Sequence, residues 1–377
     1  MFGLNIELEK RVPGLDLARA IAIFLVVFSH SLWISENYPP YIKWFMNFTA
    51  TIGVEIFFVI SGFLIGKIIY RIIQKDDFSF KDVREFWKRR WFRTLPNYYL
   101  VLIINIILWY LIYGKIPEKI GLYFVYLQNF FSHSPDFSRI SWSLSVEQFC
   151  YILGPVLLYL MIRFFPNLNR KKLFLWITCF IITVVILIRF WFHSTHELAS
   201  IYEWNENLRK VSVYRLDAIY YGFLAFYLYV NFPINLTVNK LLFTIGMFGI
   251  VTLHLFIFYW GITFETNPGF FNIFYLSLNS AAICCLMPFL FTIKIQSMWV
   301  LKIITLLSLL SYSIYLLHYT IILHSMKVIL PSDHLTGISL LTYTLTYWLL
   351  ILVFSYLLYR FFEKPMTNLR DRKKVIS

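Results

Sequence analysis

The sequence predicts an all-α fold, a polytopic bundle of about ten transmembrane helices with both termini in the cytoplasm. Of the 377 residues, 59% are hydrophobic and only 14% are charged, whereas a soluble domain usually carries about 25% charge. Apolar runs of about 20 residues, enough to cross a bilayer, recur along the whole chain. Lys and Arg gather in alternate connections between these runs, as expected when cytoplasmic loops collect positive charge.

Each predicted span lies between breaks that carry Pro, Gly, Asn or charged residues. The first follows MFGLNIELEKRVPG, which has no small-residue cleavage site, so we expect a retained span rather than a signal peptide. The connection 114–141 is too long for a simple loop and has room for an interfacial or re-entrant helix. The spans are 15–34, 51–70, 93–113, 142–162, 173–193, 214–231, 241–260, 270–292, 303–323 and 338–361.

The net charge of +14 comes mainly from Lys and Arg residues in the connections between the predicted spans. With a cytoplasmic N-terminus, the inner connections hold the main basic clusters, at 84–93, 163–172 and 360–374. We therefore interpret the charge as an orientation signal and predict no nucleic-acid partner. We expect residues 1–377 to form one membrane domain, and we see neither an internal repeat nor a fused soluble domain in this sequence. The four cysteines lie in apolar stretches without metal-ligand spacing, so we predict buried thiols and no metal site.

Two ionisable residues interrupt the first span. Arg19 and His30 are eleven residues apart, about three helical turns, so they share one face and lie roughly 16 Å apart along the axis. Ionisable residues inside a membrane are costly and are functional candidates by default. Imidazole is suited to proton transfer near neutral pH, although a hydrogen-bonded structural histidine is the alternative.

The other ionisable residues fall at two depths. Arg19 and the cluster Arg89, Arg90 and Arg93 belong to the inner side. Guanidinium groups one turn apart suit phosphate oxygens; a stop signal or a lipid phosphate site is the alternative. Polar residues at the outer edge can also snorkel to water, and Arg215 and Asp217 can form a structural pair with each other or with a neighbour. The outer group consists of His30, Glu55, Glu147, Arg215, Asp217 and His318.

Five ordered stretches carry a family resemblance. They are RVPGLDLARAIAIFLVVFSH, GVEIFFVISGFLIG, FWKRRWFRTLPNYY, SWSLSVEQF and LSYSIYLLHY, with YRLDAIYYG and FFEKPM as weaker additions. Together they resemble the integral-membrane acyltransferase family 3, the O-acyltransferases of bacterial surface sugars and related molecules. The resemblance runs from residue 11 to about residue 366.

The resemblance implies transfer of an acyl group, commonly acetyl, from cytoplasmic acetyl-CoA to a hydroxyl of a glycan or lipid-linked sugar beyond the bacterial cytoplasmic membrane. It assigns essential roles to Arg19 and His30, and CoA binding to the RRxxR motif of Arg89, Arg90 and Arg93. We expect His30 to act as general base, with Glu147 or Glu55 orienting it or holding the acceptor. Further substrate-contact candidates are His318, Arg215, Asp217 and Trp142.

Several alternatives stay open. A covalent acyl-enzyme through Ser61, Ser143 or His30 is one route, and direct transfer is the other. Outer-loop aromatics such as Tyr38 and Trp204 suit sugar stacking, but aromatic belts also mark membrane interfaces.

This sequence also departs from the family pattern. Glu55 stands where the family usually has Asp, and Gln148 replaces a second Glu. Some relatives carry a fused extracytoplasmic hydrolase-like domain. We therefore expect this chain to complete transfer alone or to pass its acyl group to a separate extracytoplasmic partner.

A transporter or flippase for a lipid-linked glycan is the alternative from another functional class, since polar groups in a bundle can line a transport path. It predicts helices broken at the midplane and paired sequence halves, and neither is visible in the sequence. A transferase should bind CoA through its inner arginines, whereas an exporter should not. Oligomeric state is not predicted, because a helix face against a neighbour and one against lipid look alike.

Overall fold

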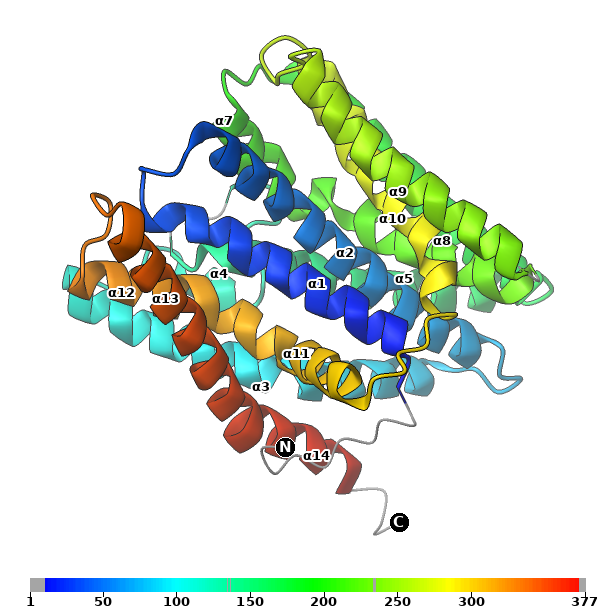
Figure 1. The fold of residues 1–377 in the computed structure, drawn as a ribbon. Coiled ribbons are helices and arrows are strands. Elements are labelled where there is room, and N and C mark those ends of the chain that lie inside the picture. Colours follow the sequence, from blue (N-terminus) through cyan, green and yellow to red (C-terminus); the bar gives the residue numbers. More distant parts are fainter. Residues whose placement is uncertain (1–10, 134, 136, 233–234, 373–377) are drawn as a thin grey trace.

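The computed structural model describes residues 11–133, 135, 137–232 and 235–372, and these residues form helices and connecting segments without a strand. α1 (Pro13–His30) and α2 (Pro40–Ile73) lie side by side in the middle of the bundle. α11 (Met298–Leu317) packs against α1, and α8 (Leu216–Asn231) and α10 (Leu276–Leu290) pack against α2 (Figure 1).

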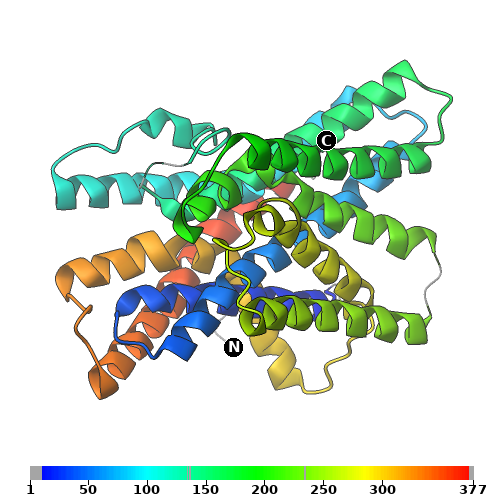
Figure 2. The ribbon, with the colours of Figure 1, turned by 90° about the horizontal axis from the view of Figure 1, so that it is seen from above.

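The remaining helices surround this centre. Viewed from above, α3 and α6 lie on one side of the bundle and α1 and α9 on the other (Figure 2). Four π-helical turns interrupt or extend the helices, at Asn205–Arg209, Phe270–Tyr275, His318–Leu323 and Tyr359–Glu363. The other helices are α3 (Phe80–Tyr113), α4 (Ile120–Phe124), α5 (Trp142–Phe164), α6 (Arg170–Thr195), α7 (Ile201–Trp204), α9 (Leu236–Tyr259), α12 (His324–Ile329), α13 (Gly337–Leu358) and α14 (Lys364–Arg372).

The predicted fold class is confirmed. Within the described residues, nine helices are long and apolar enough to cross a membrane. The segment predicted at 214–231 is also helical, as α8, but its 16 residues make it shorter than a usual span. In the long connection 114–141, the only described α-helix is the five-residue α4. The side of the membrane on which each terminus lies stays a prediction.

Two helices begin more than ten residues earlier than predicted. α2 starts at Pro40 instead of 51, and α3 starts at Phe80 instead of 93. The first turns of α3 are charged and therefore fail a hydropathy criterion, although they are helical. A capping box begins this helix, because the Asp82 carboxylate accepts a hydrogen bond from the Ser79 N–H at 3.0 Å.

Glycines allow α2 and α8 to pack backbone against backbone. A Cβ added to Gly222 would lie 2.2 Å from the Val59 carbonyl oxygen, and one added to Gly62 would lie 1.9 Å from the Ile219 carbonyl oxygen. Small residues permit such close approach between membrane helices. The contact holds together the half of the core in which α6 and α10 also meet α8.

We expect Gly222→Ala to destabilise the protein by at least about 1–3 kcal/mol, the usual cost of overpacking, because the backbone of α2 cannot yield as a side chain can. Thermal unfolding in detergent measures this. Gly249→Ala in α9 is the matched control, since its Cβ would meet Ala282 at an ordinary 3.5 Å. A Gly222→Ala variant as stable as this control would contradict the close packing of α2 and α8.

Candidate active site

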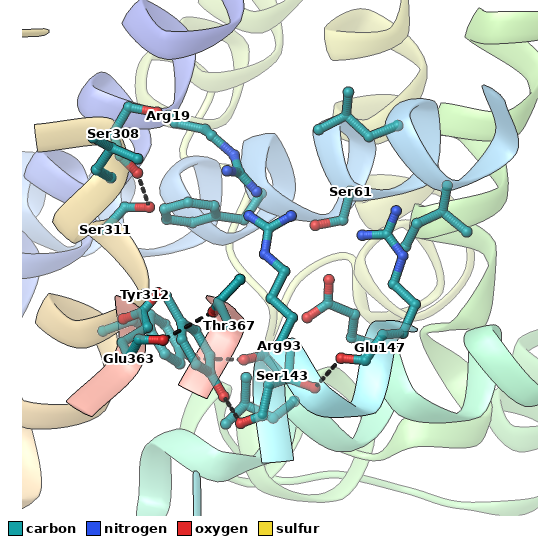
Figure 3. Close-up of a pocket in the computed structure, with 18 of the residues that line it drawn as sticks. Arg19, Ser61, Arg93, Ser143, Glu147, Ser308, Ser311, Tyr312, Glu363 and Thr367 are labelled. Carbon is teal, nitrogen blue, oxygen red and sulfur yellow. Dashed lines mark hydrogen bonds between the residues drawn. The ribbon is translucent and has the colours of Figure 1, made fainter. Parts of the chain in front are cut away.

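A cavity of about 420 Å³ opens among α1, α2, α3, α5, α11 and α14 (Figure 3). We call the end of the bundle with Arg11, Arg90 and Arg93 the arginine end, and the opposite end, where α1 finishes at His30, the histidine end. The cavity wall combines charge with apolar residues such as Val54, Phe57 and Leu144. Its charged residues are Arg11, Arg19, Arg90, Arg93, Glu147, Glu363 and Lys364.

Two of the cavity's arginines differ in how they are held. Arg11 donates from Nε to the Asp16 carboxylate at 2.7 Å, and Ser308 Oγ donates to the same carboxylate at 2.6 Å. The charge of Arg11 is therefore already balanced. Arg19 Nε is buried and has no hydrogen-bond partner within the described ranges. Arg19, Arg93 and Glu147 reach the same space from three helices (Figure 3), so the cavity can receive a polar, anionic ligand. The prediction that Glu147 belongs to the outer group is therefore wrong. α3 begins at Phe80, so Arg93 lies more than three turns into the helix and reaches the depth of Glu147.

The two carboxylates of this wall each have a hydroxyl partner. Glu147 accepts a hydrogen bond from the Tyr151 hydroxyl, one turn along α5. Glu363 accepts one from Ser313 Oγ at 2.6 Å and lies at the end of the π-helical turn before α14. Glu363 belongs to the motif FFEKPM but was not predicted as a site residue. Its position in the cavity depends on how α14 folds back, and the sequence pattern does not show this.

The three predicted CoA-binding arginines fall at two adjoining cavities. Arg90 and Arg93 line the cavity described above and also a second one of about 410 Å³ at the same end. Arg89 lines only the second, where it is half exposed and pairs with Glu85 at 2.8 Å. The two spaces therefore share a cationic edge. The structure brings the arginine cluster together there, although only two members face the cavity beside Arg19.

At the histidine end, the structure brings the two predicted histidines together. His30 Nδ1 lies 2.9 Å from the Val26 carbonyl oxygen and 3.3 Å from His318 Nε2. His318 Nδ1 lies 2.8 Å from the Tyr315 carbonyl oxygen and 3.0 Å from that of Ile314. His318 begins a π-helical turn, a feature that often marks functional sites.

These contacts assign the protons of a neutral pair. Carbonyl oxygens only accept, so His318 carries its proton on Nδ1 and its Nε2 accepts. His30 Nδ1 then faces two acceptors and carries the proton of that ring. The lone pair of His30 is left on Nε2, for which the described part of the chain supplies no hydrogen-bond partner. His30 Nε2 is therefore the nitrogen of this pair that can accept a further proton.

Tyr315 separates the histidine pair from the cavity. Its ring centroid lies 5.7 Å from that of His318, and its side chain lines the cavity wall. The Tyr315 hydroxyl donates to the Ile140 carbonyl oxygen at 2.9 Å, so at the 2.6 Å contact with Ser143 Oγ it accepts. Ser143 thus gives its proton to a tyrosine oxygen rather than to a base, an arrangement that does not activate a serine nucleophile.

The remaining predicted site residues lie in the core, away from the cavities. Glu55 pairs with Arg215 and accepts from Ser280 Oγ at 2.7 Å. Asp217 pairs with Arg189 and accepts from Ser277 Oγ at 2.8 Å. Each pair therefore has one serine from α10. Arg215 and Asp217 form structural pairs with separate neighbours, an alternative that the sequence left open.

Trp142 is also buried in this region. The Arg209 guanidinium lies over its ring at 5.4 Å, and Phe58 packs against the ring edge-on. None of Glu55, Trp142, Arg215 and Asp217 lines the cavities described here. Arg189 was not predicted as a notable residue, although it is an arginine inside the predicted span 173–193, and the same signal identified Arg19. No group of three or more His, Cys, Asp or Glu in the described residues is arranged to hold a metal.

Comparison with known proteins identifies the family. The family model of the acyltransferase domain, acyltransferase family 3, matches residues 12–360. O-acetyltransferase OatA of Staphylococcus aureus is 28% identical over 95% of this chain. A putative O-acetyltransferase of the same species is 24% identical over 94% of it. Peptidoglycan O-acetyltransferase OatA of Listeria monocytogenes is 26% identical over 42% of this chain and 26% of its own length.

This chain spans 57% of the length of each of the two Staphylococcus aureus relatives. No solved structure matches it. The family match extends over the residues that build the cavity wall from Arg19 to Tyr359, and over the histidine pair. With nearly the whole membrane domain included in the match, the chain belongs to the integral-membrane acyltransferase family 3.

Proposed function

We propose that this protein is an O-acetyltransferase of the bacterial cytoplasmic membrane. It takes acetyl from acetyl-CoA at the arginine end, in the cytoplasm, and delivers it to a glycan hydroxyl at the histidine end. The proposal rests on one observation: the two ends of the bundle carry different functional groups. An arginine-lined cavity reaches Tyr315, and beyond Tyr315 lies His30 with an unshared lone pair.

The arginine end suits the donor. Guanidinium groups bind phosphate oxygens in bidentate fashion, and Arg90 and Arg93 face both adjoining cavities. The phosphates of CoA bind there, with Arg89 at the outer rim. The narrow pantetheine arm then occupies the space of about 420 Å³, with Arg19 along its path.

Direct transfer requires one proton acceptor. The acceptor hydroxyl gives its proton to His30 Nε2 while its oxygen bonds to the thioester carbonyl carbon. The C–S bond then breaks, and the CoA thiolate leaves with the proton that His30 had accepted, which restores the neutral imidazole. His318 holds the His30 ring in orientation, the role that the sequence analysis gave to Glu147 or Glu55. Glu147 lines the arginine-end cavity, which we call the donor cavity. Glu55 forms an ion pair with Arg215 in the core.

The acceptor is proposed from the relatives. One is named a peptidoglycan O-acetyltransferase, and a cell-envelope glycan, free or lipid-linked, is the acceptor class proposed here. The Staphylococcus aureus relatives are longer than this chain. A separate extracytoplasmic protein that receives the acetyl group is the corresponding alternative to direct transfer.

Arg90→Ala tests the donor site. Loss of charge-assisted hydrogen bonds worth about 1.5–3 kcal/mol should raise the Kd for acetyl-CoA by roughly 10- to 100-fold. Purified protein in detergent and isothermal titration measure this. Arg163→Ala is the control, because Arg163 is an exposed cation in the last turn of α5 and lines none of the cavities. If the wild-type protein binds no acyl-CoA, the donor assignment is wrong and a transporter becomes the better description.

A further inference from the structure

A separate cavity of about 370 Å³ lies at the histidine end, between the end of α3, the turn before α5 and the start of α12. Its size is within the range of small-molecule sites. It shares no lining residue with the arginine-end cavity. The lining residues are Asn105, Leu108, Trp109, Tyr113, Phe137, Ser138, Arg139, Tyr319, Thr320 and His324.

Aromatic rings form one part of this cavity. The Trp109 ring centroid lies 4.3 Å from that of Tyr113 and 5.6 Å from that of Phe137, so the three rings form a continuous apolar surface. Tyr113 is 45% exposed and lies at the rim. Its hydroxyl contacts His324 Nε2 at 3.2 Å. The rim is therefore polar and open, while the ring surface lies inside.

Two polar atoms in this cavity lack partners. Trp109 Nε1 and Thr320 Oγ1 are buried, and neither has a hydrogen-bond partner among the residues described. A buried donor left unpaired costs about 1–3 kcal/mol, so a ligand that pairs with it gains that amount. An acyl chain or a lipid tail supplies no such partner. A ligand with an apolar face and several hydroxyl groups does.

The cavity is next to the proposed base. Tyr319 is part of its wall, and the ring centroid of Tyr319 lies 5.0 Å from that of His30. Tyr315, one turn earlier on the same helix, lines the donor cavity. The histidine pair therefore lies between the two cavities, with one tyrosine on each side.

We propose that this cavity binds the sugar ring of the acceptor whose hydroxyl is acetylated. The C–H face of the ring stacks on Trp109, and its hydroxyl groups pair with Trp109 Nε1 and Thr320 Oγ1. A further hydroxyl points past Tyr319 toward His30 Nε2. The proposal rests on the proposed function and moves sugar recognition away from the outer-loop aromatics and Trp142, which the sequence suggested.

The test separates acceptor binding from donor chemistry. Purified wild-type protein and variants receive radiolabelled acetyl-CoA and glycan fragments released from the envelope of the expressing cells. We expect Trp109→Ala to raise the KM for the fragments by about tenfold or more, from lost stacking and a lost hydrogen bond. Thr320→Val, which keeps the side-chain shape, should raise it several-fold. The KM for acetyl-CoA and its hydrolysis without acceptor should stay at wild-type values.

Trp176→Ala is the matched control, because Trp176 is 56% exposed on α6 and lines none of the cavities. Trp109→Phe is the second variant in case Trp109→Ala folds poorly, since it keeps an aromatic ring and removes the indole N–H. Wild-type acceptor KM in both Trp109 variants and Thr320→Val would overturn the acceptor site. Absence of acetyl-CoA binding and of transfer in the wild-type protein would instead refute the proposed function.

Discussion

Replacement of His30 by alanine is expected to lower acetyl transfer by a factor of about 10²–10⁴, the usual contribution of a positioned general base. The reason is the proton arrangement of the pair, in which His30 Nδ1 is engaged by Val26 and His318 and leaves Nε2 as the only basic nitrogen that faces a ligand. Acetyl-CoA binding should be unchanged, because His30 does not line the donor cavity. Transfer assays and titration with acetyl-CoA measure the two effects.

His254→Ala provides the control for a lost imidazole. His254 in α9 is buried, has the same type of contact from Nδ1 to the carbonyl oxygen four residues earlier, and also contacts Tyr275. It lines neither cavity, so its replacement should leave kcat unchanged. His318→Ala should reduce kcat less than His30→Ala does, because His318 only positions the base. Transfer at the wild-type rate by the His30→Ala protein would show that another group accepts the proton.

Arg215→Met is expected to destabilise the protein by about 3–5 kcal/mol, because it leaves the Glu55 carboxylate buried without its counter-ion. Both side chains are about 1% exposed or less, and Ser280 from α10 supplies the other contact of Glu55. The pair therefore links α2, α8 and α10. Unfolding in detergent, followed by circular dichroism, measures the change.

The double replacement Glu55→Leu with Arg215→Met tests the interpretation. Removing both charges should restore much of the lost stability, since an apolar pair of similar volume is often no worse than a buried ion pair. Asp333→Asn is the control, because the Lys327–Asp333 pair is partly exposed and should contribute less than about 1 kcal/mol. A double variant as unstable as Arg215→Met would mean that Arg215 acts through contacts other than this carboxylate.

The sequence was sufficient for the helices and for the depth of most of their polar residues. Glu147 is the exception, because it was expected at the outer edge with His30 and lies in the arginine-end cavity. Hydropathy identifies which segments cross a bilayer because it depends on composition alone, and the confirmed fold class rests on it. Depth follows from position along a span, which is why His30 and His318 were correctly expected at one level. The charged first turns of α3 were not predicted, because hydropathy does not detect them and their helicity depends on capping.

Pairing between helices could not be predicted in the same way. Arg215, Asp217 and Glu55 were expected at one depth, but which face of α8 meets α2 or α6 depends on packing between segments far apart in sequence. The partner of Asp217 is Arg189, which the sequence analysis passed over. Similarly, Trp109 appears in the sequence as one more aromatic of an apolar helix. Its role as a cavity wall depends on Phe137 and Thr320, which come from other segments.

The separation of the two cavities also has a consequence for the ion gradients across the membrane. Tyr315, Ser143 and the two histidines lie between spaces that have no lining residue in common. In the proposed reaction only an acetyl group, attached throughout to one carrier or the other, has to pass from one space to the other. Water and ions need no continuous path at any stage. The proposed transfer to a glycan can therefore take place on one face of an energised membrane without dissipating the proton gradient across it.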